Sequence, residues 1–210
     1  MRITYLFDPL CGWCYGAVPA LERLAQLDAA IVELAPSGLF AGEGARPMDV
    51  NFAAFAWQND QRIARLSGQQ FTDAYRTKIL GKAGSMFDSA PATLGVVAVG
   101  LTELAREIDA MKVLQYARYV DGRDNSELVV VGDILEGAGF GEAARRVRAP
   151  DEALLSAYRQ RTSAARSEMK RFGVNGVPAL IVEDGHGRRL ISSNILFGDF
   201  DTLAATLQAA

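Results

Sequence analysis

Two cysteines are the residues of this sequence whose type and spacing best fit a chemical role. Cys11 and Cys14 are the only cysteines among 210 residues, and two residues separate them. A pair at this spacing, at the beginning of a helix and directly after a strand, is typical of thiol–disulfide exchange. The positive end of the helix dipole stabilises a thiolate, which is the form that attacks a disulfide. We therefore expect Cys11 to be the exposed, attacking sulfur and Cys14 to resolve the mixed disulfide.

Other interpretations of the cysteine pair stay open at this point. The two residues could be buried structural cysteines, or half of a zinc site that another chain completes. The sequence holds one histidine, too few soft ligands for a four-ligand zinc site of its own, so we expect no metal. Attachment of a c-type haem is excluded because residue 15 is tyrosine rather than histidine.

The segments around the cysteines predict a strand, a helix and a second strand. Residues 3–7 are rich in β-branched and aromatic side chains and end at an Asp-Pro turn, which indicates a short buried strand. Apolar residues then recur every three or four positions through residues 11–27, as they do in a helix. Residues 31–34 predict another strand, closed by Pro36. A βαβ unit of this kind implies that its two strands are parallel.

The middle of the chain, residues 37–150, shows almost no strand-like alternation and is expected to be helical. Asp124 and Glu127 resemble a capping box that opens one of these helices. Three aromatic residues are expected in the core of this helical domain or along a groove that faces the cysteines: Phe52, Phe55 and Trp57.

The last part of the chain returns to a mixed pattern. A long helix is expected over residues 151–172, and a final helix over residues 199–207. Between them, residues 179–183 and 189–193 predict two strands joined by a glycine-rich hairpin turn. The two ends of the chain together would form one mixed four-stranded sheet, with the helical block inserted between them.

Two prolines mark positions near the predicted reactive turn. Pro19 follows Cys14 by five residues and should kink the helix, because proline removes a helical hydrogen bond. Pro178 opens a predicted strand within a glycine-flanked turn. That position is a candidate for a cis peptide bond, although trans is the commoner isomer.

Together these features resemble the DsbA family of thiol–disulfide oxidoreductases, in which a thioredoxin fold carries an all-helical insertion. The likeness rests on the C-x-x-C motif, on the proline five residues after it, and on Val177-Pro178 before a strand. Residues 8–16, 37–42 and 122–124 look like the FrnE-like, cytosolic subgroup of predicted protein-disulfide isomerases. The resemblance implies an α/β protein with thioredoxin-like segments at residues 1–36 and 151–210 and a helical insertion domain at residues 37–150.

The resemblance also implies how the site residues divide the work. Cys11 would be the nucleophile and Cys14 the resolving thiol. Pro178 would be cis and packed against the disulfide, while the backbone of Val177 would pair with an extended substrate peptide. Trp13 is expected to border the site, where it would receive an apolar substrate side chain or cover the thiol.

One departure from the family concerns the proton of the resolving thiol. Many thioredoxin-fold enzymes hold a buried acid six residues before the first cysteine, and here that position is Tyr5. Asp8 is closer in sequence but is assigned to the turn. The sequence therefore does not identify the proton acceptor for Cys14. The dipeptide between the cysteines lacks histidine, which predicts an intermediate redox potential.

Composition excludes several other classes of function. The formal net charge is −3, so no strong field attracts nucleic acid or an anionic membrane surface. No apolar run reaches the 18 residues or more of a membrane-spanning helix. The first residues lack a long apolar signal core, and we expect a cytoplasmic protein.

We therefore predict a cytoplasmic oxidoreductase or isomerase that acts on protein or small-molecule disulfides through the Cys11/Cys14 couple. It would bind no cofactor, and its partners would be an extended peptide or thiol substrate and a cellular thiol reductant, with glutathione as one candidate. The alternative is a glutathione-dependent transferase or isomerase of the kappa-like class, which acts on a small apolar substrate and usually lacks the second cysteine. A third, non-enzymatic hypothesis is an adaptor that senses redox state or shares a metal.

Overall fold

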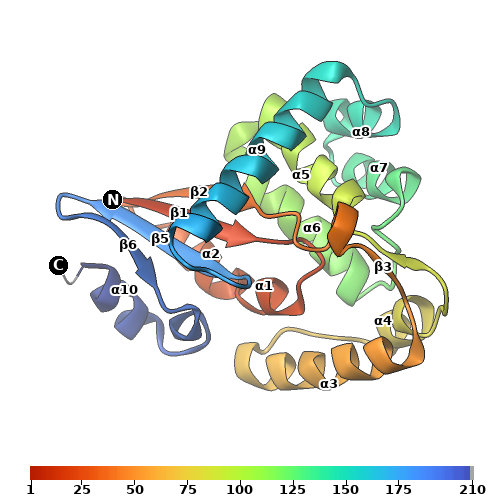
Figure 1. The fold of residues 1–210 in the computed structure, drawn as a ribbon, viewed down its shortest axis with the longest axis horizontal. Helices are drawn as coiled ribbons and strands as arrows, with labels where there is room; N and C mark the ends of the chain where they lie inside the picture. The colour runs from red at the N-terminus through yellow and green to blue at the C-terminus, as the bar shows by residue number, and fades with distance from the viewer. Residues whose placement is uncertain (209–210) are drawn as a thin grey trace.

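The computed structural model describes residues 1–208, which are built around a mixed four-stranded sheet (Figure 1). The strand order is β2–β1–β5–β6, in which β1 is parallel to β2 and antiparallel to β5, and β6 is antiparallel to β5. The strands are β1 (Arg2–Phe7), β2 (Ile31–Pro36), β5 (Ala179–Asp184) and β6 (Gly187–Ile191). Strands from both ends of the chain therefore share one sheet, which confirms the predicted thioredoxin arrangement.

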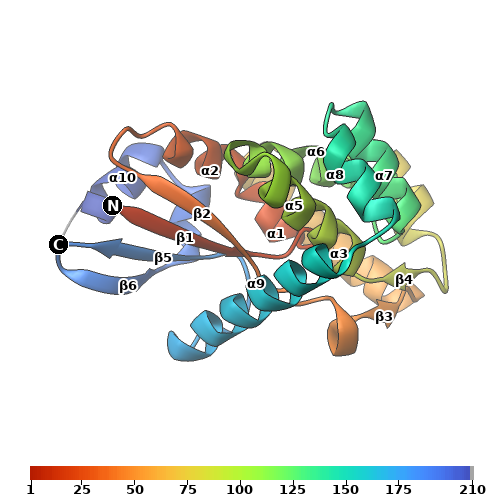
Figure 2. The same ribbon diagram turned by 90° about the horizontal axis from the view of Figure 1, so that it is seen from above.

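Helices lie on both faces of this sheet. Figure 2 shows α9 on one side and α2 and α10 on the other. The helices are α1 (Gly12–Gly16), α2 (Val18–Ala25), α3 (Val50–Ser67), α4 (Asp73–Tyr75), α5 (Ala90–Thr102), α6 (Glu107–Tyr119), α7 (Leu128–Gly137), α8 (Gly141–Arg148), α9 (Glu152–Arg171) and α10 (Phe200–Gln208). Shorter helical turns cover Gly42–Gly44, Arg76–Leu80, Leu104–Arg106 and Ser193–Phe197.

The alternation of β1 places its side chains in two different cores. Leu6 packs with Ala165 and Met169 of α9 in a small cluster. Tyr5 and Phe7 point to the other face and join a larger cluster of buried apolar residues, which continues through the helices between α3 and α8. The insertion therefore packs directly on the sheet and its first helices.

The predicted helix over residues 11–27 is divided in two. Helix α1 ends at Gly16, and α2 begins at Val18 with Pro19 in its first turn. Proline is tolerated there because the first N–H groups of a helix have no partner within it. The kink expected from Pro19 is thus a break at Ala17, directly after the cysteine pair.

Several local expectations for the insertion need correction. The block is not purely helical, because the two-residue strands β3 (Arg46–Pro47) and β4 (Met86–Phe87) pair in a small ribbon. The capping box is wrong, although the helix is right: α7 has no side-chain cap at Glu127, and the Asp124 carboxylate accepts a bond from the N–H of Ser126 instead. Phe55 is exposed rather than part of the core, since it lies on the outer face of α3.

The second strand of the hairpin also begins earlier than expected. Gly187 pairs with Asp184, so β6 covers Gly187–Ile191 rather than residues 189–193. Within residues 1–208, none of the helices combines the length and apolar character that crossing a bilayer requires. The same residues hold no cluster of three or more histidine, cysteine or acidic side chains suited to a metal ion.

Candidate active site

The cysteine pair lies where β1 meets α1, at the carboxyl end of a central strand. The N–H of Cys11 donates to the carbonyl of Asp8 at 3.1 Å, and Cys11 is the residue that precedes the first turn of α1. Both cysteines are free thiols. Cys14 is fully buried, whereas Cys11 keeps 6% of its surface exposed. The order of exposure is as expected, but Cys11 is far more covered than the sequence suggested.

The loop before β5 supplies part of that cover. The Cys11 thiol donates to the carbonyl oxygen of Val177 at 3.3 Å, although 166 positions separate the two residues. The Val177–Pro178 peptide bond is cis, as the resemblance implied, and Pro178 is buried. The structure therefore brings Cys11 together with Val177, one of the residues predicted to bind the substrate.

Trp13 lies at the rim of the site, half-buried on α1. Its ring meets the edge of Phe197, with centroids 5.2 Å apart and planes at 85°. The Arg62 guanidinium of α3 lies 5.6 Å from the centre of the same ring, close enough for a cation–π contact. Trp13 is thus fixed between the last part of the chain and the insertion, with part of its surface free.

Cys14 is held in the apolar interior beneath the reactive turn. The Tyr5 hydroxyl donates to the carbonyl oxygen of Cys14 at 3.2 Å. Burial raises the pKa of the Cys14 thiol well above its usual range, and a hydrogen bond to Cys11 raises it further. Burial likewise keeps the pKa of Tyr5 well above its ordinary value, so Tyr5 stays neutral and acts as a donor. Burial and the contact with Cys11 therefore favour the protonated form of the Cys14 thiol.

Asp8 is a site residue that the sequence analysis assigned only to a turn. Its carboxylate is completely buried and accepts three hydrogen bonds, from the N–H of Leu10 at 2.9 Å, the N–H of Phe40 at 3.1 Å and the hydroxyl of Ser89 at 2.7 Å. Burial raises the pKa of Asp8, and these donors oppose that rise. The negative charge of Asp8 in turn raises the pKa of Cys14. The sequence did contain a signal for this residue: Asp8 directly follows an apolar strand and lies three residues before a C-x-x-C motif.

The insertion contributes a second buried carboxyl group, which the sequence did not single out. Asp60 of α3 is 4% exposed and accepts a hydrogen bond from the Tyr75 hydroxyl at 3.0 Å. A β-carbon on Gly12, between the two cysteines, would come within 2.5 Å of its Oδ1 atom. Tyr119 of α6 donates to the carbonyl of Leu10 at 2.8 Å. The insertion thus contacts the cysteine turn from two helices.

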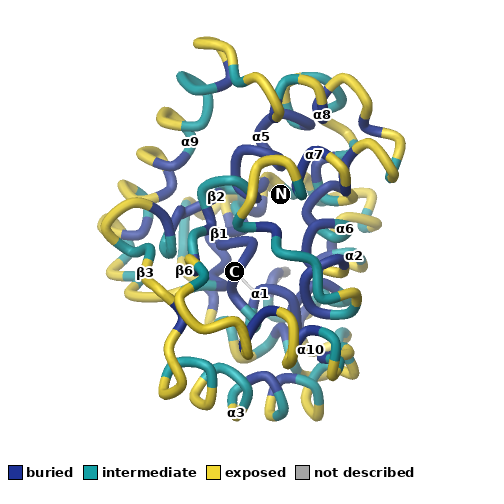
Figure 3. The backbone as a smooth tube through the Cα atoms, turned by 90° about the vertical axis from the view of Figure 1, so that its right-hand side faces the viewer, coloured by how far each residue is buried: buried dark blue, intermediate teal, exposed yellow. Residues whose placement is uncertain are grey.

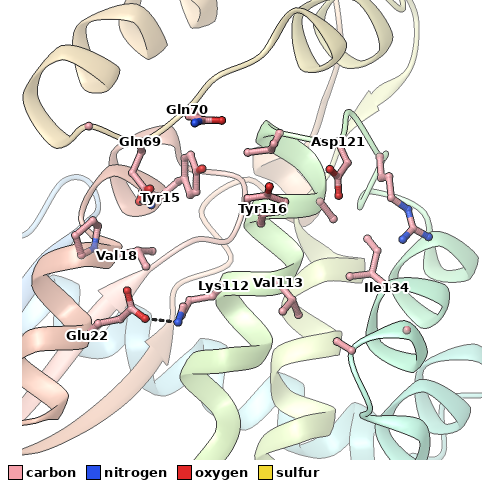
Figure 4. Close-up of a pocket in the computed structure, with 17 residues that line it drawn as sticks. Tyr15, Val18, Glu22, Gln69, Gln70, Lys112, Val113, Tyr116, Asp121 and Ile134 are labelled. Carbon is pink, nitrogen blue, oxygen red and sulfur yellow. Dashed lines mark hydrogen bonds and ion pairs between the residues drawn. The ribbon is translucent and has the colours of Figure 1, made fainter.

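A groove of about 690 Å³ lies behind the cysteine turn, between α2 and the insertion helices α6 and α7 (Figure 4). Tyr15 lines it, and an ion pair between Glu22 and Lys112 crosses its floor. Burial raises the pKa of Tyr15 to about 12, so this phenol is neutral. Neither cysteine lines the groove, so it is separate from the two sulfurs.

Comparison with known proteins agrees with this geometry. The family described as DSBA-like thioredoxin domain matches residues 2–208. The cytosolic disulfide reductase DsbM from Pseudomonas aeruginosa superimposes with a TM-score of 0.86 at 29% sequence identity, covering 100% of both chains. A structure of DsbM with GSH gives a TM-score of 0.84 at 29% identity and covers 99% of this chain and 98% of that one.

A proposed protein disulfide isomerase from Nitrosomonas europaea is also similar, with a TM-score of 0.78 at 27% identity. The match covers 100% of this chain and 98% of that one. No curated protein sequence matches the chain. These similarities extend over the whole chain, so the insertion and the sheet are shared together.

Proposed function

We propose that this chain, which belongs to the family of DSBA-like thioredoxin domains, reduces or rearranges disulfides through Cys11 and Cys14. The family and its similar structures make it a disulfide oxidoreductase or isomerase. The observation that carries the assignment of these residues is the Cys11 thiol against the Val177 carbonyl, with Cys14 fully buried beneath it. Cys11 thus keeps a small exposed surface, and Cys14 keeps none.

In the proposed reaction the Cys11 thiolate attacks a substrate disulfide, RS–SR′. The bond between Cys11 and RS forms, the S–S bond breaks, and R′S⁻ leaves and takes up a proton. Cys14 then loses its proton and attacks the Cys11 sulfur, which releases RS⁻ and forms the Cys11–Cys14 disulfide. The substrate gains two electrons. Two molecules of a thiol reductant, R″SH, then reduce the Cys11–Cys14 disulfide and leave as one disulfide, R″S–SR″.

Asp8 is the proton acceptor that we propose for Cys14. Its buried carboxylate is close enough for its charge to raise the pKa of the Cys14 thiol. A base with a raised pKa can take a proton near neutral pH and return it in the reverse reaction. Tyr5 occupies the family's usual position for the acid, but its hydroxyl is a hydrogen-bond donor to the Cys14 carbonyl oxygen, and its side chain carries no carboxylate that could accept a proton.

The substrate that suits this site is an extended peptide segment next to a disulfide. The backbone of Val177 would pair with it as a short added strand, and Pro178 would pack against the disulfide. Trp13 would take an adjacent apolar side chain on its free surface.

For the reductant we propose glutathione, and for the compartment the cytoplasm. DsbM, which shares the whole fold, is named a cytosolic disulfide reductase and was solved with GSH. A reducing compartment favours reduction and rearrangement of disulfides over their net formation.

Reduction of insulin with glutathione as the electron donor tests the proposal. Cys11→Ser should lose activity to the uncatalysed rate and trap no substrate. Cys14→Ser should retain the attack and accumulate mixed disulfides, which intact-protein mass spectrometry detects. Equal trapping by both variants contradicts the assignment of roles. Turnover of a model electrophile with glutathione, together with no insulin reduction, would favour the kappa-like alternative instead.

A further inference from the structure

Helix α3 of the insertion buries few of its side chains. Figure 3 shows it at the edge of the molecule, where exposed and intermediate residues alternate along the helix and the buried part is short. Of its 18 residues, the buried ones are Asp60 and Ile63. A surface helix normally buries an apolar stripe, so a carboxyl group at the centre of the contact is unexpected.

Both buried residues face the helix that carries the cysteines. A β-carbon on Gly12 would come within 2.5 Å of the Asp60 carboxyl and 3.2 Å of Ile63. A β-carbon on Gly16, one turn later, would collide with Ile63. The two glycines therefore let α3 approach α1 closely, and Asp60 is the charged group at that contact.

The groups around Asp60 compensate its charge only in part. The Tyr75 hydroxyl of α4 gives it one hydrogen bond at 3.0 Å. Arg118 of α6 favours the ionised form from a distance, but this guanidinium bonds to Asn125 at 3.1 Å and lies 3.8 Å from Asp124. The Asp60 charge raises the pKa of Tyr119 on the same helix, so this phenol does not compensate it. Cys11 is next to Gly12 in the chain.

We propose that Asp60 is a positioning residue of the redox couple, through which the insertion makes the stability of the Cys11 thiolate depend on pH. As a neutral acid it packs against Gly12 without opposing the thiolate. As a carboxylate it places a like charge against Gly12, the residue that follows Cys11. Burial raises the pKa of Asp60 to about 7, so both forms exist in the range where the enzyme would work. This inference rests on the proposed function of the Cys11/Cys14 couple.

The test compares the Asp60→Asn variant with the unaltered protein at two pH values. The alkylation rate of Cys11 is measured in a Cys14→Ser background, and the equilibrium with glutathione is measured with both cysteines present. At pH 5.5 the two proteins should have the same alkylation rate and the same equilibrium constant with glutathione. At pH 7.5 Asp60→Asn should increase the alkylation rate, or the equilibrium constant for reduction by glutathione, by about three- to tenfold.

Two further variants separate this effect from a structural one. Asp121→Asn makes the same charge change at an exposed position of the insertion. Its alkylation rate and its equilibrium constant, each divided by that of the unaltered protein, should be one at both pH values. Tyr75→Phe keeps the carboxyl but removes the hydrogen bond that lowers its pKa, so the pH-dependent step should move to higher pH. Tyr75→Phe also provides the test if Asp60→Asn does not fold.

The proposal is overturned if the ratio of Asp60→Asn to the unaltered protein, for the alkylation rate and for the equilibrium constant alike, is the same at pH 5.5 and 7.5. It is also overturned if Asp121→Asn gives the same pH-dependent ratio. Because alkylation needs no substrate turnover, it also distinguishes the two hypotheses. A protein that shows the pH-dependent ratio but does not reduce insulin would contradict the proposed function and support the role of Asp60.

Discussion

The two carboxyl groups next to the cysteine pair belong to different regions and are held in different ways. Asp8 follows β1 directly, and three donors at 2.7 to 3.1 Å surround its carboxylate. Asp60 reaches the site from α3 of the insertion and has one close donor, Tyr75. Burial raises the pKa of both, but only Asp8 has several hydrogen bonds that favour its charged form. The comparison suggests that Asp8 handles protons of Cys14, while Asp60 adjusts the electrostatics of the turn.

The largest expected effect tests Asp60 through the pH dependence of stability. Its pKa is about 7 in the folded protein against an ordinary value of 3.8, so between these values the folded state holds a proton that the unfolded state has lost. Stability should therefore fall as pH rises from 4 to 7, by up to about 4 kcal/mol at 1.4 kcal/mol per pH unit. Asp60→Asn should remove this part of the slope in urea unfolding at pH 4.5 and 7.5. An identical slope in both proteins would show that Asp60 is ionised throughout.

The next effect tests Asp8 through the chemistry of Cys14. Asp8→Asn keeps the size of the side chain but removes the base, so mixed disulfides should resolve about 100-fold more slowly at pH 7. The alkylation rate of Cys11 should change little. Quenched-flow mass spectrometry measures the lifetime of the mixed disulfide, and an unchanged lifetime would exclude Asp8 as the proton acceptor.

Ser89→Ala provides a milder change at the same carboxylate. The Ser89 hydroxyl lowers the pKa of Asp8, so its removal should raise that pKa and move the pH dependence of the resolving step upward. It leaves Asp60 untouched, so the alkylation ratio described for Asp60→Asn should persist in this background. Loss of that ratio would mean that the two carboxyl groups act as one network.

A smaller effect tests how closely the insertion packs on α1. Gly16→Ala introduces a methyl group that meets Ile63 and lies 3.1 Å from Phe197, which should cost about 1–3 kcal/mol of stability. Gly137→Ala is the matched control, because nothing lies within 4 Å of a β-carbon at the end of α7. Equal melting temperatures for the two variants would show that α3 can move away from α1 without loss.

The smallest effect concerns the ion pair between Glu22 and Lys112, which joins α2 to the insertion across the groove (Figure 4). The side chains are 38% and 34% exposed. Pairs with this exposure contribute roughly 0.2–1 kcal/mol. A double-mutant cycle with Glu22→Gln and Lys112→Gln measures the coupling, and a value well above this range would make the pair a main contact between the two regions.

Much of the fold was predictable because local patterns and packing agree. The β-branched run of β1, the helical period after it and the hairpin turn before β6 each follow from short-range chemistry. Errors arose where a local signal competed with tertiary contacts. Phe55 has the right period for the stripe of α3, but it is exposed, whereas Phe52 and Trp57 of the same helix are partly buried against the core.

The sequence by itself determined the spacing of the cysteine pair, the strand-to-helix junction that carries it, and the division into a sheet from both chain ends and a largely helical block. These follow from spacing, periodicity and turn residues, all of which act between near neighbours in the chain. Only the tertiary structure decided which groups surround the sulfurs. Val177 meets Cys11 across 166 positions, and Asp60 meets Gly12 from a separate helix. Burial and the number of donors determine what a carboxyl group does, and both depend on residues that are distant in sequence.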